Sequence, residues 1–347
     1  MSTKTIGTKA IFFAAANGYN GFRSYFDELF NSAEYERIFV LKGGPGTGKS
    51  SLMRRVEHGL GERGYKTEAI LCSSDPDSLD GVIAERDGGR VAILDGTAPH
   101  ERDAVIAGAI DTLVPLGELW DERFIKAQKN KIKELTLEKS AAYKTAYSYL
   151  KIAGSANATI KSADGAADPR RMNAAVDLII SRLGDIKRAG SGTRLVSAFG
   201  KRGYTTLDTV DKLSDTKIVI GGSATHSHAL MNAVLARIDS LGFGRIRLPS
   251  PLSDAETEGL LFCEQRISVL AASTDDCAVN ADDIFENSAT DKERARAAVQ
   301  LHRYALDEAV RWFGIASDMH TRLEEIYTSA MRFEEMDKIY ESVMSGL

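Results

Sequence analysis

A short glycine-rich segment in the first part of the chain has the residue types and the spacing of a phosphate-binding loop. Gly43, Gly48, Lys49 and Ser50 match the pattern G-x-x-x-x-G-K-[ST], the Walker A motif. In such a loop backbone N–H groups surround phosphate oxygens, the lysine reaches the β and γ phosphates, and the hydroxyl ligates Mg²⁺. The sequence therefore predicts a nucleoside triphosphate site formed by Gly43, Gly44, Pro45, Gly46, Thr47, Gly48, Lys49, Ser50 and Ser51.

An acidic residue follows a second strand-like run further along the chain. Residues 91–94 are consecutive apolar side chains, and Asp95 comes directly after them. This arrangement is typical of a Walker B strand, whose carboxylate holds Mg²⁺ directly or through a water. We therefore predict Ser50 and Asp95 as metal ligands, with Lys49 and Asp95 in the catalytic set.

Hydrolysis also needs a group that positions the attacking water. Many ATPases place a glutamate directly after the Walker B aspartate, but Gly96 stands there. The substitutes near the expected strand ends are Asp77, Asp80, Glu85 and His100, and His100 and Asp77 are preferred. An arginine that stabilises the transferred phosphoryl group is expected too, and the unranked candidates are Arg54, Arg55, Arg86, Arg170 and Arg171.

Apolar periodicity indicates the elements that hold these residues. Apolar runs predict buried strands at 38–41, 66–72 and 90–95. The helix after the loop should span 51–63 and end before Gly64, a residue typical of helix C-termini. Aromatic and apolar residues at helical spacing predict a further helix at 21–30. This order of elements predicts an α/β fold.

The middle of the chain reads as helical. Near-heptad apolar spacing predicts a long helix over 119–151, then a loop over 154–171 that contains several glycines, then a helix over 172–183. Lysines and one arginine make residues 123–151 basic. A solvated helix face explains this charge, and a surface for nucleic acid or an acidic partner is the alternative.

The chain contains an internal repeat. Residues 217–231 overlay the Walker A segment with a constant shift (221 − 43 = 178), so that Gly43 and Gly44 fall on Gly221 and Gly222. The correspondence extends to the third strand, where 90–94 falls on 266–270, and to Asp80, which falls on Glu258. Because an acid also stands there in the other copy, a structural role is expected for Asp80. We expect one α/β unit to be duplicated.

Only the first copy keeps the residues expected to bind phosphate and Mg²⁺. Gly48, Lys49, Ser50 and Asp95 are replaced in the second copy by His226, Ser227, His228 and Ala271. The second unit is therefore expected to fold without binding a nucleotide. His226 and His228 lack a third metal ligand nearby, so we interpret them as an exposed loop pair and assign them no role.

Residues 36–100 carry a resemblance to a known family. The segments Val-Leu-Lys-Gly-Gly-Pro-Gly-Thr-Gly-Lys-Ser-Ser, Ser-Ser-Asp-Pro-Asp-Ser-Leu-Asp-Gly and Ala-Ile-Leu-Asp-Gly-Thr-Ala-Pro-His resemble a bacterial family of tandem P-loop ATPases described as nucleotide-kinase-like. The resemblance covers most of the chain and implies a P-loop NTPase α/β sandwich with ATP as the ligand. In that family the second half often carries a Walker A loop as well, and this chain departs from it there.

These observations predict two P-loop NTPase three-layer sandwiches with mostly parallel sheets, duplicated in tandem, each with a helical extension. The expected division is 1–120 for the intact unit, 121–190 for its helical extension, and 191–347 for the degenerate unit with its C-terminal helices. The expected activity is Mg²⁺-ATP hydrolysis at one site. The alternatives are a kinase for a small molecule or nucleotide and a non-hydrolysing, ATP-gated scaffold.

Composition limits the partners and the compartment. The formal net charge of −5 gives no global attraction to nucleic acid or to an anionic membrane. The odd set of Cys72, Cys263 and Cys277 lacks metal-ligand spacing and suggests reduced thiols. No apolar run has the length of a membrane span or of a signal sequence. We therefore expect a cytoplasmic protein without membrane contact, with a nucleoside triphosphate and an unknown acceptor or protein as partners.

Overall fold

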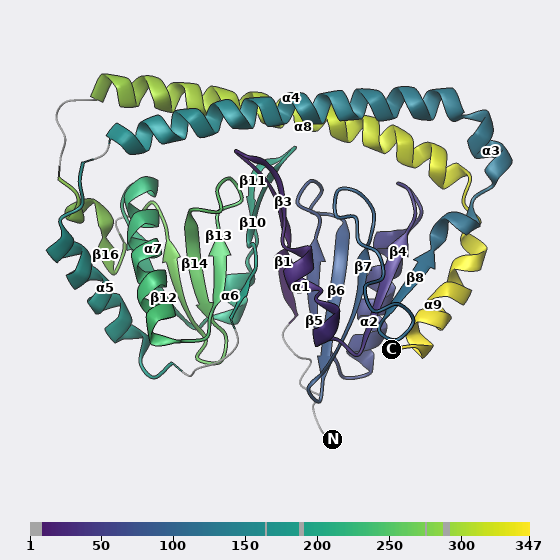
Figure 1. Ribbon diagram of the computed structural model, residues 1–347, viewed down its shortest axis with the longest axis horizontal. Coiled ribbons are helices and arrows are strands. Elements are labelled where there is room, and N and C mark those ends of the chain that lie inside the picture. Colours follow the sequence, from purple (N-terminus) through teal and green to yellow (C-terminus); the bar gives the residue numbers. More distant parts are fainter. Residues whose placement is uncertain (1–8, 164, 187–190, 275, 287–291) are drawn as a thin grey trace.

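Two α/β units lie side by side in the computed structural model and are bridged by a pair of long helices (Figure 1). The structure describes residues 9–163, 165–186, 191–274, 276–286 and 292–347. Among these residues no helix is long and apolar enough to cross a membrane.

Each unit contains a six-stranded sheet, and the two strand orders correspond position by position. The first sheet has the order β1 (Ala10–Phe13), β5 (Lys66–Leu71), β6 (Leu79–Arg86), β7 (Gly89–Asp95), β4 (Arg37–Lys42), β8 (Asp111–Pro115). The second has the order β9 (Gly192–Thr193), β13 (Ile246–Pro249), β14 (Thr257–Phe262), β15 (Ile267–Ala271), β12 (Thr216–Gly221), β16 (Val279–Asn280). In both sheets the third strand is antiparallel to its neighbours and the other pairs are parallel. The expected duplication of a mostly parallel α/β unit is thus present in the topology.

The side chains of the buried strands point alternately to the two faces of the first sheet, and different helices cover each face. Phe39 and Leu41 belong to one apolar cluster with α2 (Lys49–Glu62), whereas Ile38 and Val40 belong to a second cluster with α1 (Phe26–Leu29). Successive residues of a strand point to opposite faces, so a run that is apolar throughout is buried on both. Each such side chain contributes roughly 1.5–3 kcal/mol when fully buried.

The second sheet is covered in a similar way. Its core combines strand residues with α5 (Pro169–Leu183) and α7 (Ala224–Leu241), through Val176, Ile179, Leu230 and Val234. α5 begins where Asp168 caps the N–H groups of Arg170 and Arg171 and where proline occupies the first helical position. The short α6 (Thr209–Leu213) lies next to β1 of the first unit.

The two units share one interface. Phe13 and Leu195 exchange both backbone hydrogen bonds (2.8 and 3.0 Å), which joins the edges of the two sheets. Two hairpins cross near this line: β2 (Ala15–Gly18) with β3 (Gly21–Ser24), and β10 (Ser197–Gly200) with β11 (Gly203–Thr206). Val196 and Leu248 of the second unit pack in the cluster that contains Ile38. The apolar core is therefore continuous between the units.

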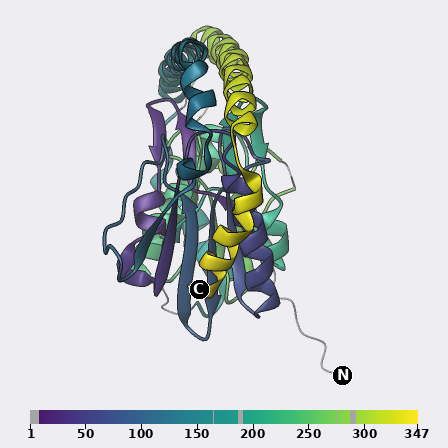
Figure 2. The same cartoon turned by 90° about the vertical axis from the view of Figure 1, so that its right-hand side faces the viewer.

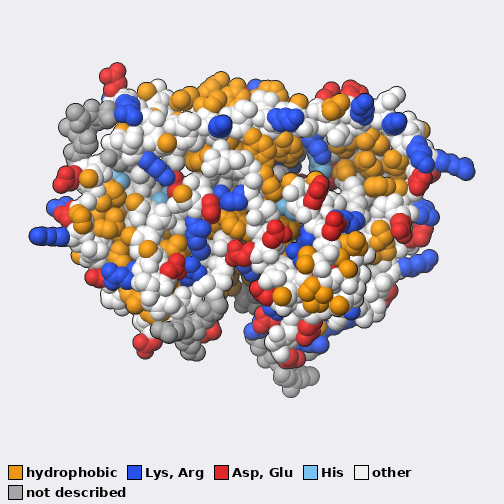
Figure 3. Space-filling model, in the orientation of Figure 1, with side chains coloured by type: hydrophobic (Ala, Val, Ile, Leu, Met, Phe, Trp, Pro, Cys, Tyr) orange, Lys and Arg blue, Asp and Glu red, His pale blue; other side chains and the backbone are white. Residues whose placement is uncertain are grey.

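A helical arm, defined as α4 (Lys129–Ala163) and α8 (Lys292–Ser329), extends across both units (Figures 1 and 2). α3 (Glu122–Ala127) precedes α4, and α9 (Met336–Ser345) follows α8. Short 3₁₀ helices lie at Ser32–Glu34, Leu116–Leu119, Ala281–Ile284 and Phe333–Glu335. On the face shown in Figure 3 the basic side chains of the arm are scattered among apolar ones and form no single patch.

The end of the chain lies on the first unit, although we expected the C-terminal helices within the second. α9 packs against α2, and Arg55 of α2 donates to Asp337 Oδ1 at 2.8 Å and stacks on Tyr340. Arg63 of the same helix donates to the carbonyl oxygen of Met344. The C-terminal segment of the chain thus packs on the first unit and not on the second.

Two expected elements are wrong. The loop predicted over 154–171 is largely helical, because α4 continues to Ala163. Gly154 lies inside it because Tyr19 packs so closely that a Cβ on Gly154 would be 2.7 Å from the tyrosine Cβ. The helix predicted over 21–30 is strand β3 followed by the short α1. The expected boundary at 190 falls at the edge of a segment outside the described residues.

Candidate functional site

The Walker A loop of the first unit has the backbone of an anion-binding turn. β4 ends at Lys42 and α2 begins at Lys49, and between them Gly46 and Gly48 have φ values of 68° and 78°. This left-handed region is costly for residues with a Cβ, so glycine is required at both positions. Thr47 stabilises the turn, since its hydroxyl donates to the carbonyl oxygen of Gly44 at 2.9 Å.

Lys49 and Asp95 meet at the end of this loop. The parallel pairing of β4 with β7 places Leu41 opposite Asp95, so the Walker B carboxylate lies at the same sheet edge as the loop. Lys49 Nζ donates to the carbonyl oxygens of Gly43 and Gly44, both at 2.8 Å, and is 3.6 Å from Asp95 Oδ2. Burial raises the pKa of Asp95, while the charge of Lys49 and the hydrogen bonds from Thr97 oppose that rise.

Ser50 and Asp95 provide the oxygen ligands that Mg²⁺ prefers. Ser50 Oγ accepts a hydrogen bond from the N–H of Leu79 at 2.9 Å, and Asp95 Oδ1 accepts from the N–H and the hydroxyl of Thr97. Each group retains a lone pair for a cation. Mg²⁺ is typically bound by one or two protein oxygens, waters and substrate phosphates, so this pair fits the ion. Within the described part of the chain no cluster of three or more His, Cys, Asp or Glu side chains could hold a metal.

The C-terminal end of α8 covers the loop. Thr328 Oγ1 donates to the carbonyl oxygen of Gly46 at 3.2 Å, and a Cβ on Gly46 would lie 2.6 Å from the carbonyl oxygen of Glu324. Burial and the charge of Asp75 raise the pKa of the Glu324 carboxyl, and the charges of Lys49 and Lys201 and the backbone of Gly46 oppose that rise. The last turns of α8 therefore bring a carboxylate close to the loop.

Further cations converge on this place, and our sequence analysis missed them. Lys201, at the tip of the hairpin β10–β11, donates to Ser317 Oγ at 3.0 Å and lies 3.4 Å from Asp75 Oδ1. Burial lowers the pKa of Lys139 on α4, against the charge of Glu324. Burial lowers the pKa of His320 to about 4, helped by the charges of Lys139 and Lys49. The second unit and the arm thus add charge to the site of the first unit.

The two preferred candidates for positioning water are both engaged by other side chains. His100 is buried, with its Nε2 3.0 Å from Asp80 Oδ2 and its ring stacked on Phe26 at 4.3 Å. Asp77 is exposed and pairs with Arg202 of the second hairpin, which lowers its pKa. The His100–Asp80 pair is therefore an interior contact of the first unit, and Asp77 joins the two units.

The arginine candidates are engaged in other contacts. Arg54 donates to the carbonyl oxygen of Asp77, Arg55 contacts α9, and Arg86 stacks on Tyr65 at 4.4 Å. Arg171 donates to the carbonyl oxygen of Asp283 in the second unit, and Arg170 is exposed at the start of α5. None of these side chains contacts the loop within the described residues.

An open groove of about 520 Å³ borders the first half of the loop. Pro115, Gly117 and Trp120 form its side opposite Gly43 and Gly44. Trp120 packs beside Tyr327 of α8 at 5.1 Å between ring centres. An aromatic face next to the loop is the kind of surface on which a nucleobase stacks.

The corresponding segment of the second unit has lost the loop itself. α7 begins at Ala224, which the constant shift places on Gly46 (224 − 178 = 46), so the turn has become helix. Ser223 caps it by accepting from the N–H of His226, and Ser227, in the place of Lys49, is buried. Our interpretation of His226 and His228 as an exposed loop pair is wrong: both lie on α7, where His226 contacts Asp282 and His228 lies 3.4 Å from Glu256.

No protein-family model, curated protein or solved structure matches the chain. The function is therefore argued from the geometry of its own residues.

Proposed function

We propose that the first unit is a P-loop ATPase that binds one Mg²⁺-ATP and uses it to change its contact with α8. The observation that carries this proposal is the contact of α8 with the loop, where Thr328 donates to the carbonyl oxygen of Gly46 and the Glu324 carboxylate lies close enough for the charge of Lys49 to act on it. The end of α8 thus lies against the turn whose backbone N–H groups hold phosphate in such loops.

The chain's own groups have defined parts in this proposal. The loop amides and Lys49 bind the phosphates, and Ser50 and Asp95 would hold Mg²⁺, which neutralises charge on the β and γ phosphates when bound. The groove at Trp120 receives the base. In hydrolysis a water oxygen bonds to the γ phosphorus, the bond from that phosphorus to the bridging oxygen breaks, ADP leaves, and the water proton passes to phosphate or solvent.

Nucleotide and Glu324 compete for the same loop. Phosphates can enter only when the C-terminal end of α8 moves away from Gly46, which breaks the Thr328 contact and frees the Glu324 carboxylate. Lys201 and Lys139 then face the transferred phosphate and supply the positive charge that an arginine finger supplies elsewhere. Nucleotide binding is thereby coupled to the position of the helical arm.

Hydrolysis is favoured over transfer to a small-molecule acceptor. The loop from Ser73 to Asp80 is the natural place for an acceptor, but the second hairpin fills it: a Cβ on Gly200 would lie 3.2 Å from the Ser73 carbonyl oxygen, and Arg202 pairs with Asp77.

The three cysteines are unpaired, which fits a reducing compartment and the proposed cytoplasmic location.

Calorimetric titration with Mg²⁺-ATP tests the proposal. One nucleotide should bind per chain, and at a hundredfold excess over its dissociation constant it should stabilise the protein by about 2.7 kcal/mol. Lys49→Ala should remove both effects. The matched variant Asp95→Asn keeps the loop amides, so it should bind ATP while phosphate release falls. Undiminished binding by Lys49→Ala, or a second equivalent site, would contradict the proposal.

A further inference from the structure

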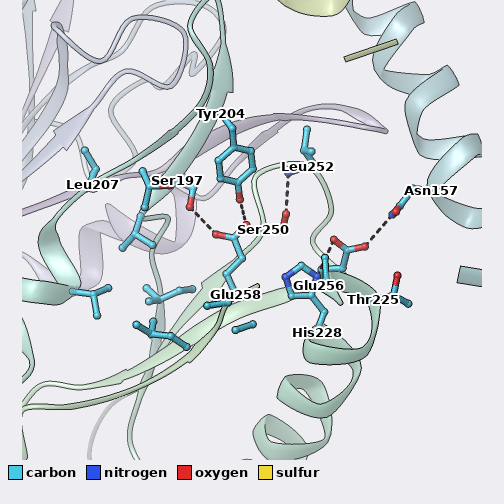
Figure 4. A pocket seen from close by; sticks show the side chains of 18 of the residues that line it. Asn157, Ser197, Tyr204, Leu207, Thr225, His228, Ser250, Leu252, Glu256 and Glu258 are labelled. Carbon is cyan, nitrogen blue, oxygen red and sulfur yellow. Dashed lines mark hydrogen bonds and ion pairs between the residues drawn. The ribbon is translucent and has the colours of Figure 1, made fainter. Parts of the chain in front are cut away.

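The second unit contains a cavity of about 540 Å³ (Figure 4). Its walls come from the end of β15, the first turns of α7, the hairpin β10–β11 and the loop before β14. Tyr19 of the first hairpin and Asn157, Lys161 and His302 of the arm close it. This volume is typical of small-molecule sites, and the position beyond the strand ends is where open α/β sheets bind ligands.

The equivalent space in the first unit is filled. Glu258 corresponds to Asp80, and Tyr204 has the hairpin position of Phe22. In the first unit His100 fills the space next to Asp80, between Phe22 at 5.2 Å and Phe26 at 4.3 Å. In the second unit the acid instead faces an open cavity. The cavity is therefore a specific difference between the copies.

Three carboxylates line this cavity: Asp211, which pairs with Lys217, and Glu256 and Glu258, whose environments differ. Glu258 accepts from Ser197 at 2.6 Å and from the hydroxyl of Tyr204, and burial raises its pKa against these two hydrogen bonds. Burial also acts to raise the pKa of Glu256, but hydrogen bonds from His228 and Lys161 outweigh it and lower the pKa to about 2. The cavity thus presents a charged acceptor and a second, more weakly acidic one.

The remaining lining explains which ligands fit. Leu207, Val210, Leu248 and Leu270 form an apolar wall, and no arginine lines the cavity among the described residues. Lys161 is already paired with Glu256 at 2.5 Å. A phosphate would meet three carboxylates, and the basic side chains Lys161 and His228 already contact Glu256, whereas neighbouring hydroxyl groups would each donate to a carboxylate oxygen.

We propose that this cavity binds an uncharged ring compound with vicinal hydroxyl groups, of the class to which nucleosides belong. The hydroxyl pair donates to Glu258 and Glu256, and the apolar ring packs against the leucine wall. This is the same chemistry by which an acidic residue binds a ribose in dinucleotide sites. The site is separate from the Walker A loop and does not depend on the function proposed for it.

The experiment is a titration of the intact chain with adenosine, guanosine, cytidine and uridine, followed by calorimetry and by ligand-observed NMR. At least one nucleoside should bind at millimolar concentration or tighter, and its 2′-deoxy and 5′-monophosphate analogues should bind about tenfold more weakly or worse. Glu258→Gln keeps the shape of the side chain and should weaken binding about tenfold, because the acceptor loses its charge. Trp120→Ala, in the groove proposed for the base of ATP, should leave nucleoside binding unchanged, which separates the cavity from the proposed ATP site.

A second variant tests whether misfolding, and not the changed cavity, explains a loss of nucleoside binding. Ala271→Leu adds volume inside the cavity at the end of β15, so it should abolish nucleoside binding while Mg²⁺-ATP still binds the first unit. The proposal is overturned if none of the four nucleosides binds, if Glu258→Gln binds as well as the parent, or if the monophosphate binds more tightly than its nucleoside. It is equally overturned if putrescine binds and no nucleoside does, since the carboxylates would then select an amine.

Discussion

The segments at the ends of β4 and β12 carry the same Gly-Gly pair in sequence, but their backbones differ from its second glycine onward, because Gly222 has a φ of 102° and Gly44 has no positive φ. After β4 the chain turns through Gly46 and Gly48 in the left-handed region and enters α2 at Lys49. After β12 the helix has already begun at Ala224. Loss of the lysine is thus accompanied by loss of the backbone that would present N–H groups to phosphate.

The same contrast appears in the hairpins that cross between the units. The tip of the second hairpin brings Lys201 and Arg202 to the Walker A side. The tip of the first brings Tyr19 to the cavity of the second unit, where its hydroxyl is 2.8 Å from His302 Nε2. Each hairpin therefore places side chains on the other unit: two cations beside Asp75 and Asp77, and an aromatic hydroxyl at the cavity.

The largest expected effect comes from making the first loop resemble the second. Gly46→Ala introduces the residue found at Ala224, at a φ of 68° and within 2.6 Å of the Glu324 carbonyl oxygen. It should cost about 2 kcal/mol in unfolding free energy and abolish Mg²⁺-ATP binding. Calorimetry and chemical denaturation measure the two effects. Gly61→Ala is the control, because nothing lies within 4 Å of its added Cβ; equal behaviour of the two variants would refute the role of the turn.

An intermediate effect is expected at the hairpin tips. Lys201→Ala removes the cation that the second unit places beside Asp75, so under the proposed function phosphate release should fall about a hundredfold while ATP binding changes little. Asn20→Ala, at the exposed tip of the other hairpin, should change neither quantity. If both variants hydrolyse ATP at the parent's rate, the second unit contributes no charge to the reaction.

The smallest effect concerns Glu324, where we predict that Glu324→Gln tightens Mg²⁺-ATP binding about fivefold at pH 8, because the competing carboxylate loses its charge. Burial and Asp75 raise the pKa of this carboxyl. As the pH falls toward that raised pKa the parent carboxyl takes up a proton, so the difference between the two proteins should shrink. Glu325→Gln, on an exposed neighbour, is the control. A difference that grows on acidification would exclude competition by Glu324.

The sequence predicted what is encoded locally. The loop, the Walker B strand and the duplicated strands depend on consecutive residues, and the structure places Asp95 beside the end of β4 as the parallel pairing requires. The exchange of hairpins could not be predicted, because Lys201 and Asp75 are far apart in sequence and no periodicity signals their approach. The same is true of Glu324, which reaches Gly46 only because α8 crosses back over both units.

Local signals also misled where packing decided the outcome. Glycines and small residues after 154 predicted a loop, but the extensive contact between α4 and α8 keeps the segment helical to Ala163. His100 was a candidate for positioning the attacking water because it lies near the expected strand ends. Its neighbours Phe22 and Phe26 come from the hairpin and α1, and they hold the imidazole in the interior.

α8 is one uninterrupted helix with an end in each unit. His302 lines the cavity, and Glu324 lies on the loop 22 residues later (324 − 302 = 22), about 33 Å along the axis. A helix hardly compresses along its axis, so an axial shift of one end of α8 must also appear at its other end. Under the two proposals, a ligand of the cavity that shifts α8 should change ATP affinity, and by thermodynamic reciprocity ATP should change the affinity for that ligand by the same factor.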